Sequence, residues 1–343
     1  MKTINYKLSL VTILLLTISL TPGCKDDTQP PIITLQGGEV LIANEGNFGW
    51  GQGTLSIYND ATKEVQNDIY SSTNSESVGN VFQSIASFNG LYFFVINNSG
   101  KVIYTDTNFV KQGEITGLTS PRNIYRIGED KAYVTDLYAD AVAIVDMKSL
   151  SVIGSIPCNG HSEEGVILRD KFWFTAPETS NIYAIDIATN TMADSITVGW
   201  MPESIVLDKN DVLWILNRGD ESKSKPPGLA SVIETDDVRV VTKNELTGAP
   251  TNLVYDNVLN KLFFINEDIM SQGTNTELSR PSVWQTAGNK VFYSIKVNTA
   301  KGELYASDIR DFVSKSVVYR YASDGTPLDE FSAGIIAGDF FFP

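Results

Sequence analysis

The chain has 343 residues, of which 26 are basic and 41 acidic, so its formal net charge at pH 7 is −15. This acidic balance excludes a protein that binds nucleic acid or an anionic lipid surface through general electrostatic attraction. With two cysteines and one histidine, the chain also lacks the Cys and His spacings of the common zinc sites. One of the cysteines, Cys158, ends an alternating apolar segment and is interpreted as a small packing residue.

The N-terminal residues have the pattern of an export signal followed by a tether. Lys2 and Lys7 precede an apolar run over residues 8–20. As a helix this run spans about 20 Å, too short for a bilayer core of roughly 30 Å. The pattern predicts a signal peptide over residues 1–23. Residues 24–36 are mostly polar and contain proline, as expected of a flexible tether.

A cysteine directly follows the predicted signal. Gly23 and Cys24 fit a lipoprotein cleavage site, with the lipid attached to Cys24, so we expect the chain to be anchored to a membrane and not to span it. Leu20 departs from the usual pattern, because it stands four residues before the cysteine and not three. The alternative is an ordinary signal-peptidase site with a cysteine nearby by chance.

From residue 37 to residue 343 the sequence repeats one pattern of short β-rich segments. The segments "KAYVTDLYADAVAIVD" from residue 131 and "KFWFTAPETSNIYAID" from residue 171 are two copies, and later copies follow at intervals of 41 to 49 residues. Four short strands every forty-odd residues, separated by Asp, Asn and Gly turns, are typical of a β-propeller. Seven copies predict an all-β, seven-bladed β-propeller with four-stranded blades. A pair of β-sandwiches would not explain the regular repeat.

The first copy, "GGEVLIANEG", starts directly with its second strand. The C-terminal segment "IIAGDFFFP" has the pattern that precedes the other copies. We therefore expect the C-terminal segment to supply the innermost strand of the first blade and to close the ring, which removes an exposed sheet edge.

One face of such a propeller collects the loops between blades and the loops that join the second and third strands of each blade. Three of the second kind are predicted to be long, at residues 44–53, 217–228 and 266–289. Long loops on a rigid scaffold are a usual location of binding sites. Aromatic, arginine and amide side chains there suit a small-molecule pocket, although aromatics can also cap blade interfaces. The candidate ligand-binding residues are Asn44, Asn47, Phe48, Trp50, Arg122, Tyr138, His161, Trp200, Arg218, Trp284 and Arg310.

An enzymatic alternative rests on four residues near the starts of the innermost strands, namely Asn123, Glu164, Glu203 and Asn252. Oxygen ligands of this kind suit Ca²⁺ in a central channel, but no fixed spacing singles out a ligand set. His161 has no identified nucleophile partner, and its alternatives are a solvated loop residue or an axial ligand to the metal of a bound haem or corrinoid. The sequence therefore predicts a binding protein and not an enzyme, with no catalytic residue, no metal site and no cofactor.

The repeated segments, such as "NIYAIDIATNTMADSITVG", look like those of the YncE-like seven-bladed propellers, and this resemblance covers about Gly38 to Pro343. The residues "CKDD" from Cys24 resemble the export tag of Bacteroides-type surface lipoproteins. The segments "LIANEGNFGWGQGTLSIYN" and "ELYASDIRDFVSKSVVYRY" resemble a narrower group, the surface propeller lipoproteins of Bacteroides that bind cobalamin (vitamin B12).

This resemblance implies cobalamin or a related corrinoid as the ligand and a TonB-dependent outer-membrane transporter as the partner that receives it. It also implies a lipid-anchored location in the outer membrane, facing the cell exterior. Two alternatives stay open. One is a binding protein for another nutrient, such as haem, a siderophore or a peptide. The other is a divalent-cation-dependent, lactonase-like hydrolase.

Overall fold

The computed structural model describes residue 35 and residues 37–234, 239–274 and 280–343. The chain divides into two compact units, residues 1–31 and 32–343, and all described residues belong to the second. The predicted signal peptide, Cys24 and nearly all of the predicted tether lie outside the described residues. No helix among the described residues has the length and apolar composition needed to cross a membrane.

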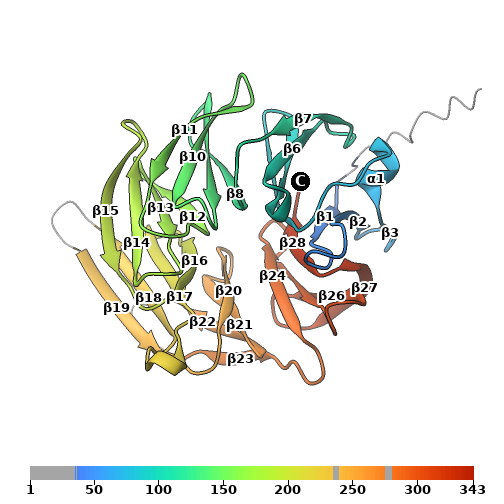
Figure 1. The fold of residues 1–343 in the computed structure, drawn as a ribbon. Coiled ribbons are helices and arrows are strands. Elements are labelled where there is room, and N and C mark those ends of the chain that lie inside the picture. The colour runs from blue at the N-terminus through green and yellow to red at the C-terminus, as the bar shows by residue number, and fades with distance from the viewer. Residues whose placement is uncertain (1–34, 36, 235–238, 275–279) are drawn as a thin grey trace, which may run out of the picture. The chain divides into compact units, whose positions relative to one another are not determined.

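The second unit is an all-β propeller. Seven four-stranded antiparallel sheets form its blades, and they are arranged around a central channel (Figure 1). The innermost strands of most neighbouring blades contact one another. The predicted fold class is therefore confirmed.

Each of the first four blades is built from four strands, in order from the innermost outward. Blade 1 consists of β28 (Ala337–Phe341), β1 (Glu39–Asn44), β2 (Thr54–Asn59) and β3 (Val65–Gln66). Blade 2 consists of β4 (Phe82–Phe88), β5 (Leu91–Ile96), β6 (Lys101–Thr105) and β7 (Lys111–Ile115). Blade 3 consists of β8 (Pro121–Arg126), β9 (Lys131–Asp136), β10 (Ala141–Asp146) and β11 (Ser151–Pro157). Blade 4 consists of β12 (Gly165–Leu168), β13 (Lys171–Thr175), β14 (Asn181–Asp186) and β15 (Thr191–Thr197).

The remaining three blades follow the same order. Blade 5 consists of β16 (Pro202–Leu207), β17 (Val212–Asn217), β18 (Gly228–Glu234) and β19 (Arg239–Glu245). Blade 6 consists of β20 (Thr251–Asp256), β21 (Lys261–Asn266), β22 (Asp268–Gly273) and β23 (Ser282–Gln285). Blade 7 consists of β24 (Phe292–Asn298), β25 (Glu303–Asp308), β26 (Lys315–Ala322) and β27 (Pro327–Ile335).

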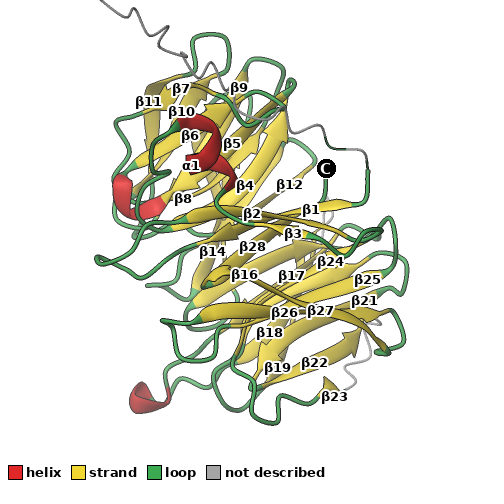
Figure 2. Ribbon diagram, turned by 90° about the vertical axis from the view of Figure 1, so that its right-hand side faces the viewer, coloured by secondary structure: helices red, strands yellow, loops and turns green. Residues whose placement is uncertain are grey.

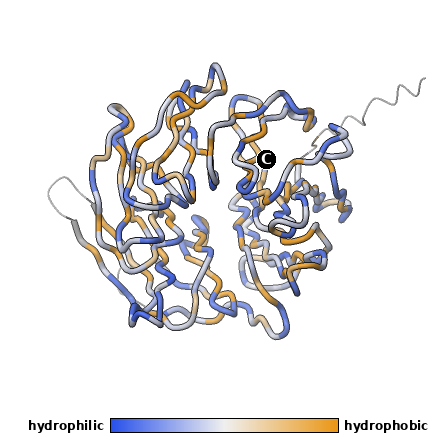
Figure 3. The backbone as a smooth tube through the Cα atoms, viewed as in Figure 1, coloured by the Kyte–Doolittle hydropathy of each residue, from blue (hydrophilic) through white to orange (hydrophobic). Residues whose placement is uncertain are grey.

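Burial differs systematically between the strands of a blade. The second strands, such as β5 with the sequence LYFFVI and β17 with VLWILN, are buried along almost their whole length. A strand covered on both faces reads as a continuous apolar run, and in this ring the cover comes from the blades on either side. The outermost strands β11 and β15 are mostly exposed. Apolar residues accordingly follow the strands, and many of the connecting turns are hydrophilic (Figure 3).

The ring closes as the sequence predicts. Strand β28 pairs antiparallel with β1, with Phe340 opposite Ile42 and Phe341 opposite Leu41. Phe340 is fully buried and packs in the same hydrophobic cluster as Tyr305 of blade 7. The two ends of the propeller domain thus meet in one blade, and that blade has no unpaired inner edge.

Blade 1 contains an element that the repeat pattern does not predict. Its outermost strand, β3, has only two residues and is followed by the helix α1 (Ile69–Asn74), drawn in red in Figure 2. Ile69 and Tyr70 of this helix are buried in the cluster between blades 1 and 2. The helix supplies the apolar cover that a longer strand would provide. Two short 3-10 helices, η1 (Asn97–Ser99) and η2 (Glu221–Lys223), lie in other loops.

The prediction of a long loop over residues 266–289 is wrong. A single residue, Glu267, separates β21 from β22. It adopts a positive φ of 60° and makes a tight turn. Strand β23 then follows within the same stretch. The polar sequence "DIMSQG" is the third strand of blade 6 and not part of a loop.

Candidate functional site

One face of the propeller holds the loops between blades and the loops that join the second and third strands of each blade. We term it the loop face. Two adjoining cavities lie there. A cavity of about 670 Å³, the channel, is lined by residues of all seven innermost strands or of the segments leading into them. A cavity of about 420 Å³, the mouth, is lined by residues from blades 1, 2, 3 and 7 and their loops. Gln83 and Arg122 line both cavities, so these two side chains lie between the mouth and the channel.

A β-bulge recurs at the second residue of four innermost strands, and three of the four bulged residues, Gln83, Arg122 and Tyr293, line these cavities. The pairing of these strands with their neighbours skips Gln83 in β4, Arg122 in β8, Glu203 in β16 and Tyr293 in β24. A bulge leaves one residue outside the ladder and re-aims its side chain. Four blades therefore have a long polar or aromatic side chain at the same bulged position near the start of the innermost strand.

Exposed aromatic side chains surround the mouth. Phe48, Tyr138 and Phe312 line it and are 70%, 63% and 52% exposed. Tyr293 lies beneath them, and its ring meets that of Phe312 edge-on at 6.5 Å. Nδ2 of Asn47 donates a hydrogen bond to the Phe312 carbonyl at 2.5 Å, which ties the loop of blade 1 to the loop of blade 7. These contacts join the blade 1 and blade 7 parts of the aromatic rim.

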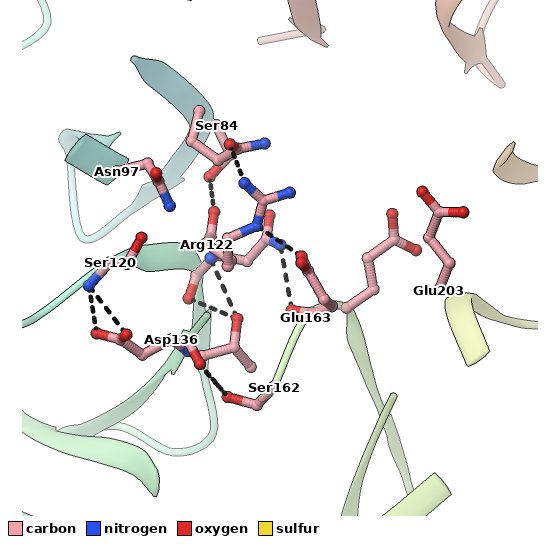
Figure 4. Close-up of polar contacts among 12 residues, drawn as sticks. Ser84, Asn97, Ser120, Arg122, Asp136, Ser162, Glu163 and Glu203 are labelled. Atoms are coloured by element: carbon pink, nitrogen blue, oxygen red, sulfur yellow. Dashed lines mark hydrogen bonds and ion pairs between the residues drawn. The ribbon is translucent and has the colours of Figure 1, made fainter. Parts of the chain in front are cut away.

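Arg122 forms the polar floor between the mouth and the channel. Its Nε donates to Oε2 of Glu163 at 2.6 Å, and its guanidinium also donates to Oε1 of Gln83 (Figure 4). The Arg122 carbonyl accepts from the Ser84 hydroxyl at 2.8 Å. Neighbouring blades therefore fix both the backbone and the side chain of Arg122.

The start of β8, and with it Arg122, is positioned by a buried carboxylate. Asp136 accepts hydrogen bonds from the backbone N–H groups of Thr119 and Ser120, at 2.9 Å each. The Asp136 N–H in turn donates to the hydroxyl of Ser162 in the next blade, as Figure 4 shows. A fully paired, buried network of this kind makes a rigid platform.

Three carboxyl groups near the cavities have unusually high pKa values. Burial raises the pKa of Glu45 to about 7, against a hydrogen bond from Tyr293 that lowers it. Burial raises the pKa of Glu164 to about 8 and that of Glu203 to about 7. Oε2 of Glu203 is buried and has no hydrogen-bond partner among the described residues. Near neutral pH these groups are partly protonated, and Glu45 in the mouth and Glu164 in the channel can then act as hydrogen-bond donors.

The channel contains some of the side chains that a cation site would use. Asn123, Glu164 and Asn252, three of the four residues of the enzymatic alternative, line it, and the fourth, Glu203, is not among its lining residues. Across the part of the chain that the structure describes, no group of three or more His, Cys, Asp or Glu side chains is arranged to hold a metal ion.

Several of the predicted site residues gather at the mouth. Phe48, Arg122 and Tyr138 line it, and Asn47 and Trp50 belong to the same loop as Phe48. Trp50 is 94% exposed.

Two more predicted residues lie around this rim. The His161 ring meets the Tyr138 ring edge-on at 5.2 Å, and its Nε2 lies 3.5 Å from Oε2 of Glu178. Arg310 is exposed in the same loop as Phe312.

Four predicted residues lie elsewhere. Asn44 is fully buried within blade 1, where its Nδ2 donates to Ser56 Oγ at 2.9 Å and its Oδ1 accepts from the Gly334 N–H. Trp284 lies on β23 and packs against Phe263 and Tyr321, so its predicted place in a loop is wrong.

The other two belong to blade 5 and the crossover before it. Trp200 lines a separate cavity. Arg218 is exposed, and its positive charge lowers the pKa of the nearby Glu203.

The sequence interpretation missed Glu45, Gln83, Tyr293 and Phe312 at the mouth. A signal for two of them exists in the repeats. Aligning the innermost strands places Gln83 in "FQS", Arg122 in "PRN", Glu203 in "PES" and Tyr293 in "FYS" at one position. Glu45 gives no such signal, because its contact with Tyr293 joins residues at opposite ends of the domain.

The family to which the chain belongs is shown by a match over residues 38–343 to the model described as "Domain of unknown function (DUF5074)". The chain is a member of the DUF5074 family. No curated protein matches this DUF5074 chain in sequence.

Solved structures show the same fold at low sequence identity. A quinonprotein alcohol dehydrogenase-like protein from Bacteroides thetaiotaomicron VPI-5482 is 15% identical, with a TM-score of 0.68 over 89% of this chain and 78% of that one. A 6-phosphogluconolactonase-like protein from Bacteroides fragilis NCTC 9343 is 8% identical, with a TM-score of 0.69 over 91% and 99%. Hydrazine synthase of Kuenenia stuttgartiensis is 14% identical, with a TM-score of 0.62 over 90% and 99%. Such varied neighbours indicate the fold and not the activity.

Proposed function

We propose that this DUF5074 propeller is a binding protein that captures cobalamin or a related corrinoid at the mouth. The observation that carries the proposal is the ring of exposed aromatic side chains, Phe48, Tyr138 and Phe312, around a cavity with a fixed polar floor. A corrin is a broad disc with several amide arms. Its recognition requires wide aromatic contact together with hydrogen-bonding groups.

The polar groups of the mouth suit the amide arms. Gln83, Asn97, Asn98 and Arg122 line it and offer both donors and acceptors. The channel beneath, about 670 Å³, gives room for a part of the ligand that projects below the rim. Because the loops of blades 1 and 7 are already joined at the rim, less conformational entropy is lost on binding, which favours high affinity.

The cellular setting belongs to the same proposal and rests on sequence resemblance. Lipidation of Cys24 would hold the propeller at the outer membrane, facing the cell exterior, and a TonB-dependent transporter would receive the ligand. Metabolic labelling with a fatty acid tests the anchor: the parent chain should take up label and Cys24→Ser should not. Co-purification of a TonB-dependent transporter from the native membrane tests the partner.

Isothermal titration of the chain with cyanocobalamin tests the ligand. The proposal expects binding at a one-to-one ratio. Parallel titrations with haem and a ferric siderophore test the other nutrients, and binding of one of these without cyanocobalamin would redirect the proposal to that ligand. Hydrolysis of a lactone that depends on added Ca²⁺ would instead support the enzymatic alternative.

A further inference from the structure

Blade 5 carries a second cavity on the loop face. It has a volume of about 190 Å³ and forms where the crossover from blade 4 meets the 218–227 loop and the ends of β18 and β19. Its walls are mainly apolar and include Val198, Trp200, Pro226, Pro227 and Leu229. It shares no lining residue with the mouth or the channel. We refer to it as the blade-5 cavity.

Two of the residues that line it, Trp200 and Asn217, each carry a buried polar atom without a hydrogen-bond partner among the described residues. The indole Nε1–H of Trp200 is a donor, and Oδ1 of Asn217 is an acceptor. Neither atom has a hydrogen-bond partner within the described ranges of the chain, and Asn217 is only 2% exposed. Buried polar groups in proteins are nearly always hydrogen-bonded. A donor and an acceptor left unpaired in one apolar cavity therefore point to a ligand that carries the complementary pair.

The charge around the cavity is positive. Nζ of Lys223 and Nζ of Lys225 lie 5.6 Å and 6.0 Å from the centroid of the Trp200 ring. Lys223 pairs with Asp220 at 2.9 Å. Lys225 and Lys243, which both line the cavity, have no carboxylate partner among the residues described, although Glu245 also lines it. In a chain with a net charge of −15, lysines without a carboxylate partner among the described residues, beside a buried donor, indicate an anionic group on the ligand.

We propose that the blade-5 cavity binds an N-acylated apolar amino acid through its free carboxylate, either as a small molecule or as the C-terminal residue of a peptide. The carboxylate accepts from Trp200 Nε1–H beside Lys225, and the acylated N–H donates to Asn217 Oδ1. The apolar side chain fills the cavity between Trp200 and the two prolines. An apolar cavity of about 150 Å³ holds a benzene molecule, so one aromatic ring fits.

Isothermal titration of the purified full chain tests this proposal with three probes: N-acetylphenylalanine, N-acetylphenylalaninamide and a short peptide ending in phenylalanine. The acid should bind, and the amide, which lacks the charge, should bind at least about tenfold more weakly. A peptide that binds more tightly than the free acid identifies a peptide C-terminus as the ligand. Equal affinities identify the small molecule.

Variants of the cavity decide whether the binding occurs there. Trp200→Phe keeps an aromatic ring, although a smaller one, and removes the donor, and Lys225→Gln removes a surface charge; each should weaken binding of the acid about tenfold. The matched control is Lys209→Gln, an exposed lysine in the turn at the other end of the same blade, which should bind like the parent. Absence of binding, equal binding of acid and amide, or unchanged affinity in Lys225→Gln would overturn the proposal. Cyanocobalamin should not compete, so the result is independent of the proposed function.

Discussion

The hydroxyl of Tyr293 donates a hydrogen bond to Oε1 of Glu45 at 3.0 Å, and this bond crosses from blade 7 to blade 1. The two residues are 248 positions apart in the sequence. Tyr293 is a bulged residue of an innermost strand, and Glu45 directly follows the strand that the C-terminal segment pairs with. The closure of the ring and the construction of the mouth therefore depend on the same contacts.

Removal of this hydroxyl should raise the pKa of Glu45 further. Burial already brings that pKa to about 7, and the bond from Tyr293 opposes the rise. In Tyr293→Phe the carboxylate loses a donor, so its charged form is less favourable. Carboxyl NMR titration measures the pKa. Tyr255→Phe removes a hydroxyl that contacts Asn260 and should leave Glu45 unchanged, and an unaltered Glu45 pKa in Tyr293→Phe would contradict the expectation.

The stability of the domain should fall as the pH rises from about 5 to 8. Glu45, Glu164 and Glu203 have folded-state pKa values of about 7 to 8, above the value of 4.5 for an unperturbed glutamate. The folded state then binds more protons than the unfolded state between these values. Their contribution is fully present below pH 4.5 and is lost as the pH passes 7 to 8.

Urea unfolding at several pH values measures this slope. For Glu45 alone the loss is on the order of 3 kcal/mol, since one pKa unit corresponds to about 1.4 kcal/mol. Glu45→Gln should flatten the profile. Glu76→Gln should not, because the pKa of Glu76 is lowered by its hydrogen bond from Lys111 and it titrates below this range. A stability that rises between pH 5 and 8 would show that these carboxylates are charged in the folded protein.

Truncation of the aromatic rim should weaken the proposed ligand binding without destabilising the fold. Phe48→Ala and Tyr138→Ala each remove an exposed ring and little packing, so we expect cyanocobalamin affinity to fall about tenfold and the midpoint of unfolding to stay the same. Val258→Ala, which shortens a side chain that is 66% exposed on a turn away from the mouth, is the control. If both rim variants bound cyanocobalamin as tightly as the parent chain, the binding site would have to lie outside the mouth.

Trp284→Ala should have the opposite effects. The Trp284 ring packs edge-on against Phe263 at 5.0 Å and Tyr321 at 5.7 Å, between blades 6 and 7. Its removal should cost about 2–3 kcal/mol of stability, less than for a fully buried ring, and should leave ligand binding intact. Trp284→Phe should recover part of the loss. Weaker cyanocobalamin binding with unchanged stability would instead show that Trp284 contacts the ligand.

Phe340→Ala tests the closure strand. Phe340 is fully buried on β28, so its truncation should cost about 3–5 kcal/mol. Thermal unfolding measures the loss, and Phe342→Ala, at a partly buried position just beyond the strand, should cost less. Equal, small effects of both substitutions would mean that β28 adds little to ring closure.

The repeat in the sequence was sufficient to predict the fold, including the pairing of "IIAGDFFFP" with the first blade. The repeat did not predict the third strand of blade 6. This strand follows the tight turn at Glu267, and its polar sequence resembles that of a loop. That error misplaced Trp284. Helix α1 was also missed, since the repeat pattern carries no signal for a blade whose outermost strand has two residues.

The site was only partly predictable, for a physical reason. Phe48, Arg122 and Tyr138 stand in or beside loops that the topology gathers on one face, so the repeat locates them. The contact of Tyr293 with Glu45 depends on ring closure and on a β-bulge, and neither is visible in one copy of the repeat. Trp200 lies on the predicted face, but the blade-5 loop encloses it in a separate cavity.

The central claim is that the mouth binds the ligand, and an absorbance titration with cyanocobalamin tests it most directly. The parent chain and the double variant Phe48→Ala/Tyr138→Ala would be titrated side by side. We expect one-to-one binding to the parent and an affinity about a hundredfold lower in the double variant. Absence of binding to the parent would contradict cobalamin capture, and equal affinity of the two proteins would contradict the mouth as its site.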